Sequence, residues 1–191
     1  MPAPAWLVQK RTGQRYHVGI TANYRGLLEL HALHYDNRAN LAALAPDIGD
    51  SAWLTFFDSL GARWTPTADW TFITQWLHGR TYVGTDLPVN AWSFDSEFLL
   101  GSWQLGAMRY SARYDRFASL QTASNFYQDI HFFLGDRGHA WTLATERRFS
   151  DHWSVTLEAT AVTSVVEQRR FTAEPLAAKE RQWQLAVRYD L

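Results

Sequence analysis

The chain has 191 residues, no cysteine and a nearly balanced charge, with 18 basic against 19 acidic side chains. Without a basic excess a nucleic-acid partner is not expected, and without thiols disulfide bonds, thiolate metal ligands and a cysteine nucleophile are excluded. No apolar run approaches the roughly 18 residues of a spanning helix. Because no linker-like stretch divides the chain, we expect a single domain over residues 1–191, in which 1–14 form a loop or a partial strand.

Alternation of apolar and polar side chains predicts nine β-strands and no helix of any length. The first strand illustrates the pattern: its even positions are Tyr16, Val18, Ile20, Ala22 and Tyr24, and polar residues or glycine stand between them. The strands are expected near residues 15–25, 27–37, 52–65, 69–83, 91–100, 103–115, 139–149, 152–166 and 179–191.

The connections between these strands alternate in length. Tight turns are expected near 25–26, 66–68, 101–102 and 150–151, and longer loops at 38–51, 84–90, 116–138 and 167–178. This rhythm is typical of an antiparallel up-and-down transmembrane β-barrel with periplasmic turns and extracellular loops. The sequence therefore predicts an all-β fold of this kind with about 9–10 strands. Complete bacterial barrels have an even strand count, so nine strands would make the chain part of a larger barrel, unless residues 5–11 form a tenth.

Ten tryptophans form the next signal. Most lie near the ends of the expected strands, where two belts of indoles would meet the two interfaces of a bilayer. The alternative is that tryptophan simply favours strands and packs in cores. We expect these residues at the membrane interface: Trp64, Trp70, Trp92, Trp103, Trp141, Trp153 and Trp183.

Charged residues on the opposite faces of the strands are the candidate pore lining. Of the 18 basic residues 16 are arginines, whose planar guanidinium suits pairing with carboxylates in a wet lumen. Ordinary salt bridges on a solvated sheet face would give the same balance of charge. The expected pore-lining residues are Arg63, Asp95, Glu97, Arg109, Arg113, Asp115, Glu146, Glu158 and Arg188.

Two charges contradict this division of faces. Asp58 falls among the apolar positions of its strand, where a mid-bilayer carboxylate would be costly. Arg147 is also on the apolar side, but it lies beside a turn and could extend its head to the interface.

The segments GHAWTLATERRFSDHWSVTLEATAVTSVVEQRR and ERQWQLAVRYDL, with SARYDRF and WTPTADWTFITQWLHGRTYVG before them, resemble the C-terminal half of Gram-negative outer-membrane porins. The likeness is greatest to the porin-like and phosphate-selective porin O/P group. It implies an outer-membrane location, a terminal signal at Tyr189 and Leu191 that the assembly machinery reads, and contact with outer-membrane lipid. A homo-oligomer is compatible with it.

We therefore expect a porin-like channel that passes small hydrophilic or anionic solutes. A soluble β-barrel that binds an apolar or sugar ligand inside is one alternative, and a non-conducting structural barrel is another. The soluble alternative predicts that Tyr16, Ile20, Trp183 and Val187 point inward. No motif for a hydrolase, phosphate loop or metalloprotease is present, and His17 and His31 have no fixed spacing to a serine or an acid. The sequence accordingly predicts no enzyme, no metal and no cofactor.

Overall fold

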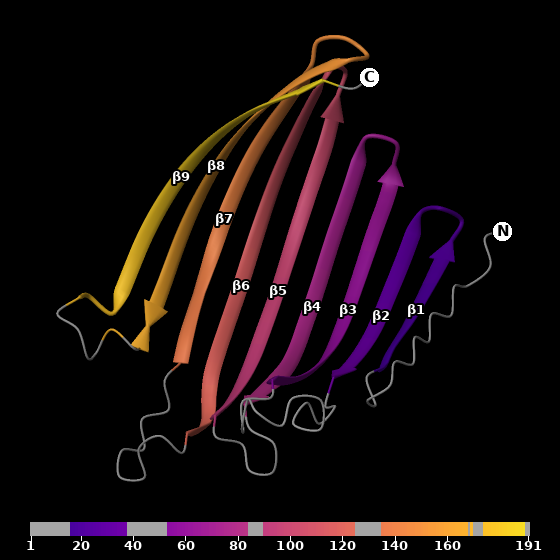
Figure 1. Ribbon diagram of the computed structural model, residues 1–191. Coiled ribbons are helices and arrows are strands. Elements are labelled where there is room, and N and C mark those ends of the chain that lie inside the picture. The colour runs from indigo at the N-terminus through magenta and orange to yellow at the C-terminus, as the bar shows by residue number, and fades with distance from the viewer. Residues whose placement is uncertain are drawn as a thin grey trace.

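The computed structural model describes residues 16–37, 53–83, 90–124, 135–167, 169 and 174–189. The predictions for residues 1–14 and for Leu191 lie outside this part of the chain. The described residues form one nine-stranded sheet (Figure 1). Its strands are β1 (Tyr16–Tyr24), β2 (Leu28–Asn37), β3 (Trp53–Thr67), β4 (Trp70–Val83), β5 (Asn90–Leu105), β6 (Met108–Ser124), β7 (Gly135–Arg148), β8 (Trp153–Val166) and β9 (Ala177–Tyr189).

The strands follow one another in chain order, and every neighbouring pair is antiparallel. The predicted all-β, up-and-down architecture is therefore confirmed. The sheet is curved and open, with β1 and β9 at its two edges (Figure 1). In the described ranges no helix has the length and apolar character needed to cross a membrane.

Glycine makes the short turns possible where the backbone enters the left-handed region. Between β1 and β2, Arg25 and Gly26 have φ of 51° and 71°, and the side-chain oxygen of Asn23 accepts a hydrogen bond of 2.9 Å from the Gly26 amide. Between β5 and β6, Gly106 has φ of 56°. The turn expected at 101–102 is thus wrong: β5 continues past Gly101 to Leu105, and the glycine five residues later makes the turn.

The β6 and β7 strands extend well into the expected loop at 116–138. β6 runs to Ser124 and β7 begins at Gly135, and the two are paired from Met108↔Arg147 to Leu120↔Gly135. Charged residues such as Arg116 gave this stretch the composition of a loop, although its side chains still alternate between the two faces. Both strands are therefore longer than predicted.

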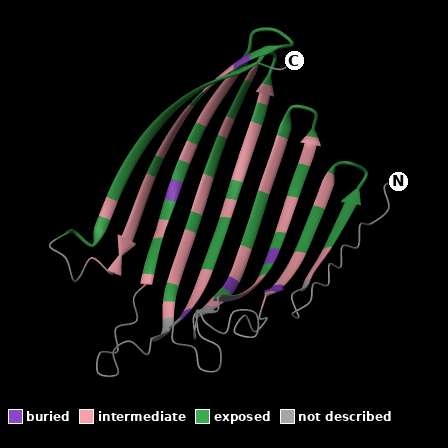
Figure 2. Cartoon of the chain, in the orientation of Figure 1, coloured by how far each residue is buried: buried purple, intermediate pink, exposed green. Residues whose placement is uncertain are grey.

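The sheet has no hydrophobic core of its own. Among the described residues only Ala91 and Ala140 are buried hydrophobic residues, and intermediate and exposed residues dominate every strand (Figure 2). Trp183 is 73% exposed and Leu185 69%. These large apolar side chains lie on one face of the sheet. That face must therefore contact an apolar surface outside the sheet.

Candidate functional site

The pairing register sorts the side chains into two faces. We call the first the apolar face; it includes Ile20, Leu30, Leu60, Trp76, Leu99, Tyr110, Leu143, Leu157 and Trp183. We call the other the polar face; it includes Thr21, Glu29, Arg63, Gln75, Arg113, Thr142, Thr160 and Gln182.

Aromatic side chains follow the apolar face at the level of the short turns. Trp70 stacks on Phe72 at 5.6 Å between ring centroids and on Trp103 at 5.8 Å, and Trp103 contacts Tyr110 at 6.0 Å. At the far end of the sheet, the ring centroids of Trp153 and Tyr189 are 4.8 Å apart. We call this the turn-side aromatic group: Trp64, Trp70, Phe72, Trp103, Tyr110, Trp153 and Tyr189.

A second group of aromatics lies nearer the long connections. It consists of Trp76, Tyr114, Trp141 and Trp183 on the apolar face, and Tyr114 and Trp141 have ring centroids 4.8 Å apart. We call it the loop-side aromatic group. Along β4 six residues separate Trp70 from Trp76, which is about 20 Å of strand. The two groups thus enclose a band of aliphatic and small residues.

Six of the seven tryptophans expected at an interface lie on the apolar face: Trp64, Trp70, Trp103, Trp141, Trp153 and Trp183. Trp92 does not. It pairs with Thr81 and Gln121 on the polar face, beyond a register shift at Ala91/Trp92. Trp76, which was not among the seven, also lies on the apolar face and belongs to the loop-side aromatic group.

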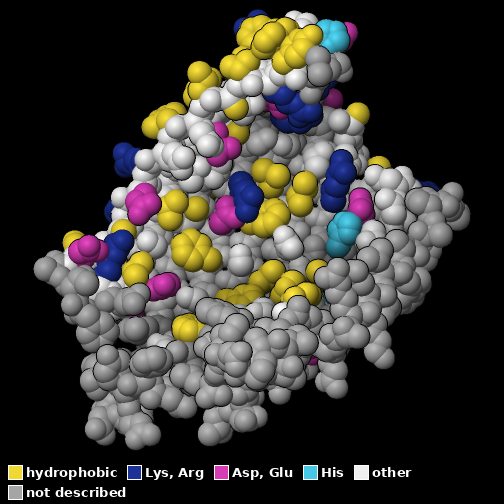
Figure 3. Space-filling view, in the orientation of Figure 1, with side chains coloured by type: hydrophobic (Ala, Val, Ile, Leu, Met, Phe, Trp, Pro, Cys, Tyr) yellow, Lys and Arg dark blue, Asp and Glu magenta, His cyan; other side chains and the backbone are white. Residues whose placement is uncertain are grey.

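The polar face carries seven of the nine residues that were expected to line a pore. They are Arg63, Arg109, Arg113, Asp115, Glu146, Glu158 and Arg188. Figure 3 shows one face of the molecule, on which basic and acidic side chains lie side by side with hydrophobic side chains between them.

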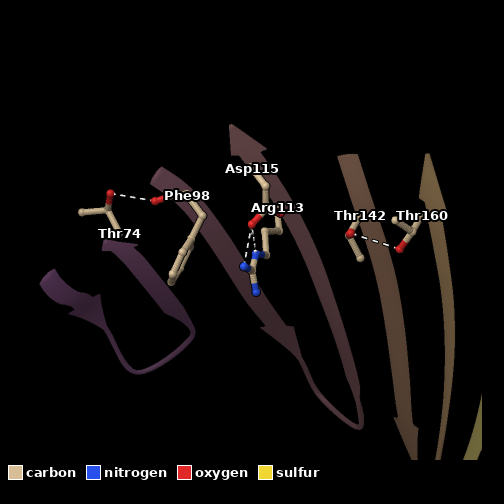
Figure 4. A network of polar contacts seen from close by, with 6 residues as sticks. All are labelled: Thr74, Phe98, Arg113, Asp115, Thr142 and Thr160. Carbon is tan, nitrogen blue, oxygen red and sulfur yellow. Dashed lines mark hydrogen bonds and ion pairs between the residues drawn. The ribbon is translucent and has the colours of Figure 1, made fainter. Parts of the chain in front are cut away.

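Arg113 is the most firmly held of these cations. Its Nε and Nη2 both donate to Oδ1 of Asp115, at 2.9 and 2.5 Å, as Figure 4 shows. Its guanidinium carbon also lies 4.2 Å from the centroid of the Phe98 ring. Next to this pair, the Thr142 and Thr160 hydroxyls hydrogen-bond across β7 and β8 at 3.1 Å (Figure 4). The result is a charged pair beside a row of hydroxyls.

Arg109 and Arg63 are held less tightly. Nη1 of Arg109 is 3.6 Å from a Glu146 oxygen, and its Nε donates to the Gln104 side chain at 3.1 Å. Arg63 forms no ion pair with another described residue. Its cross-strand neighbour Glu29 contacts Nε2 of His31 instead, at 3.1 Å. The polar face thus offers cations with different degrees of neutralisation.

Asp95 and Glu97 are on the apolar face, so their expected grouping with the pore-lining residues was wrong. Asp95 Oδ1 is 2.6 Å from His78 Nδ1, and Glu97 lies 3.3 Å from Arg116. The phenylalanines of β5 face the other way: Phe94 lies over Gly79 on β4 and Phe98 lies against Arg113. A β-carbon at Gly79 would come within 2.5 Å of the Phe94 ring.

Asp58, which sequence reasoning could not explain, belongs to a row of alternating histidine and aspartate side chains. His34, Asp58, His78 and Asp95 are directly paired across β2, β3, β4 and β5. Asp58 Oδ1 is 2.6 Å from His34 Nδ1, and both side chains are well exposed, at 57% and 38%. Since the row runs one step beyond Leu60 and Trp76 toward the loops, Asp58 lies outside the apolar band.

Arg147, the second charge that contradicted the expected faces, is on the apolar face beside the turn between β7 and β8, where its guanidinium lies 4.8 Å from the Phe149 ring centroid.

Nowhere in the described chain do three or more histidine or acidic side chains gather as metal ligands would.

Nine antiparallel strands with one apolar and one polar face define an outer-membrane β-barrel fold. The solved structure of OmpT lacking loop L8, an outer membrane protein of Vibrio cholerae, has this fold, with a TM-score of 0.63 and 12% sequence identity. The match covers 92% of this chain and 53% of that one, so the chain spans about half the length of its solved neighbour. No protein-family model matches the sequence, and no curated protein does. The resemblance to the porin O/P group is therefore not confirmed.

The prediction that the chain is not an enzyme must be corrected. The prediction rested on the absence of catalytic sequence motifs. The fold that the chain shares with OmpT does not exclude catalysis. The register also joins His34 to Asp58 and His78 to Asp95 at 2.6 Å, pairs that are 24 and 17 residues apart in sequence. No spacing motif would have revealed them, so the motif search was no basis for the exclusion.

Proposed function

We propose that the chain lies in the outer membrane of a Gram-negative bacterium as the wall of a porin-like channel for small hydrophilic or anionic solutes. The observation that carries this proposal is the contrast between the two faces of one sheet. A membrane barrel exposes apolar side chains to lipid and keeps polar ones toward its lumen, which is the reverse of a soluble barrel.

The apolar face supports the membrane side of the proposal. Ile20, Val187 and Trp183 are 52%, 62% and 73% exposed, although a soluble barrel would bury them. Aromatic groups on both sides of the aliphatic band match the girdles expected at the two interfaces. In this arrangement outer-membrane lipid and the assembly machinery are the partners of the apolar face and of the strand that ends in Tyr189.

The polar face supports the channel. Its arginines are paired to different extents, and Arg63 has no described counter-ion. Fixed positive charges beside a wet path raise the local concentration of anions, while neighbouring carboxylates and hydroxyls keep the path hydrated. This combination favours anionic and neutral polar solutes over cations.

Conductance across a planar lipid bilayer tests the function directly. The protein is refolded in detergent micelles, inserted into the bilayer, and its reversal potential is measured in a KCl gradient. Arg109→Gln together with Arg113→Gln should move the reversal potential toward cation selectivity, because two cations leave the lumen. Arg147→Gln, on the apolar face, is the matched control and should leave selectivity unchanged.

Two outcomes would contradict the proposal. Insertion without any conductance would favour a structural barrel with a closed lumen. A cooperative β-fold in plain buffer, without micelles, would favour a soluble barrel that binds its ligand inside. A homo-oligomer would be seen as several conductance steps for each insertion event.

A further inference from the structure

The apolar face has a groove that the channel function does not use. It extends from Trp70 on β4 across β5 to β9, mostly over small side chains, has a volume of about 620 Å³, and is bounded by aromatic rings. Gly101, Ala112 and Ala159 form its floor, with Leu143 between them, and Trp103 and Trp183 stand at its rims. An elongated apolar molecule fits such a surface better than a polar solute does.

Four residues from the floor of the groove toward the loops, beyond Tyr114 and Trp141, lies a row of hydrogen-bond donors. Arg116, His139, Thr163 and Lys179 are paired across β6, β7, β8 and β9, so their side chains follow one another at about 4.8 Å on the apolar face. Guanidinium, hydroxyl and ammonium groups are the donors that phosphate oxygens accept. We call this the donor row.

The charge around the donor row is not balanced. Arg116 contacts Glu97 at 3.3 Å, and the nearby Arg137 is 3.9 Å from Glu167. Lys179 and Arg181, both exposed, form no ion pair with any described residue. The apolar face therefore has two cations without a carboxylate partner next to the loop-side aromatic group.

The distance between groove and donor row suits one molecule. Along β6, Arg116 is four residues from Ala112, and along β9, Lys179 is four residues from Trp183. Four residues of strand measure about 13 Å. A lipid whose acyl chain lay in the groove could thus bring its headgroup to the cations.

We propose that β5 to β9 form a specific binding site for a lipid with an exposed phosphate in the leaflet on the long-loop side. The acyl chain lies over Ala112 and Ala159, and the phosphate accepts hydrogen bonds from Lys179, Arg181 and the donor row. This inference depends on the membrane placement proposed above, but it does not depend on conduction.

Native mass spectrometry of the refolded protein in neutral detergent tests the site. The probes are phosphatidic acid, diacylglycerol, which has the chains without the phosphate, and inorganic phosphate, which has no chains. We expect phosphatidic acid to be retained in preference to both. Lys179→Gln with Arg181→Gln should weaken retention about tenfold, since two charge-assisted hydrogen bonds are lost.

Matched variants separate charge from shape. Arg63→Gln with Arg148→Gln removes two cations from the polar face and should leave lipid retention unchanged. Ala159→Phe fills the groove and should reduce retention of phosphatidic acid and diacylglycerol alike, whereas Ala22→Phe on β1 of the same face should not. Refolding of every variant is checked by circular dichroism.

Equal retention by the wild type and by Lys179→Gln with Arg181→Gln would overturn the inference. Displacement of phosphatidic acid by an equal concentration of inorganic phosphate would overturn it too, since only an ion site would then remain. Conductance of the same samples keeps the two proposals apart: a conducting protein without lipid preference refutes only the lipid site, and a lipid-binding protein without conductance refutes only the channel.

Discussion

Arg113 and Asp115 lie two residues apart on β6, and both Nε and Nη2 of the arginine donate to one carboxylate oxygen of the aspartate. The guanidinium carbon of the same arginine lies 4.2 Å from the centroid of the Phe98 ring. A cation held in this way is partly neutralised, so its influence on a passing anion depends on its partner.

Removal of that partner should therefore increase anion selectivity. We predict that Asp115→Asn moves the reversal potential toward anions, the opposite direction to Arg113→Gln. Glu180→Gln, in the same cross-strand row, removes an equal charge that has no described ion pair, and should give a smaller shift. Equal shifts in Asp115→Asn and Glu180→Gln would show that Asp115 acts only as a distant charge.

Gly79→Ala should destabilise the sheet. A β-carbon there would lie 2.5 Å from the Phe94 ring and 2.6 Å from both Phe57 Cβ and the Phe56 carbonyl oxygen. Because two of these three contacts involve the backbone or an atom next to it, the expected loss is about 1–3 kcal/mol in free energy of unfolding. Urea titration in micelles measures it.

Gly61→Ala is the control, since its nearest contact would be an ordinary 3.5 Å. An equal loss at both glycines would mean that general strand propensity, rather than the phenylalanine packing, sets the requirement for glycine.

The apolar face should tolerate charge only beyond the loop-side aromatic group. Leu143→Arg places a cation in the middle of the apolar band, where the expected cost is about 2–4 kcal/mol in vesicles. Thr163→Arg adds the same charge to the donor row and should cost about 0–1 kcal/mol. Refolding yield into vesicles against urea measures the difference, and equal yields would contradict the orientation of the sheet in the membrane.

Asp58→Asn should change stability by no more than about 1 kcal/mol, because its contact with His34 joins two exposed side chains. The same measurement on refolded protein in vesicles checks this result. A large gain in stability would instead mean that the carboxylate is buried in hydrocarbon.

Most of the strand positions could be predicted from alternation alone. β1 to β4 were expected within two residues at every boundary, because one side of each strand is almost purely apolar near the turns. The two-residue period is a local property, and it requires no knowledge of the partner strand.

For β5 the alternation was recognised, but its two faces were assigned the wrong way round. Its phenylalanines mark the apolar side in the sequence, but Phe94 and Phe98 lie on the polar face, over Gly79 and against Arg113. The side of a strand is set by register with its neighbours, which single-sequence periodicity does not contain. The His34–Asp58 and His78–Asp95 contacts were missed for this reason as well.

The two aromatic groups also define a slope. Cross-strand pairing over the five strand spacings from β4 to β9 connects Trp76 with Lys179. On β9, however, the residue of the loop-side aromatic group is Trp183, which lies four residues closer to the short turns than Lys179. The same cross-strand pairing connects Trp70 with Leu185. The turn-side aromatic group ends at Tyr189 on β9, again four residues closer to the short turns. At about 3.4 Å per residue and 4.8 Å between strands, the line through each aromatic group makes an angle of about 30° with the direction of cross-strand pairing. When both lines lie parallel to the plane of a bilayer, the strands are tilted by this angle from the membrane normal. The positions of the tryptophans in the sequence therefore specify the strand tilt, and with it the shear of the barrel.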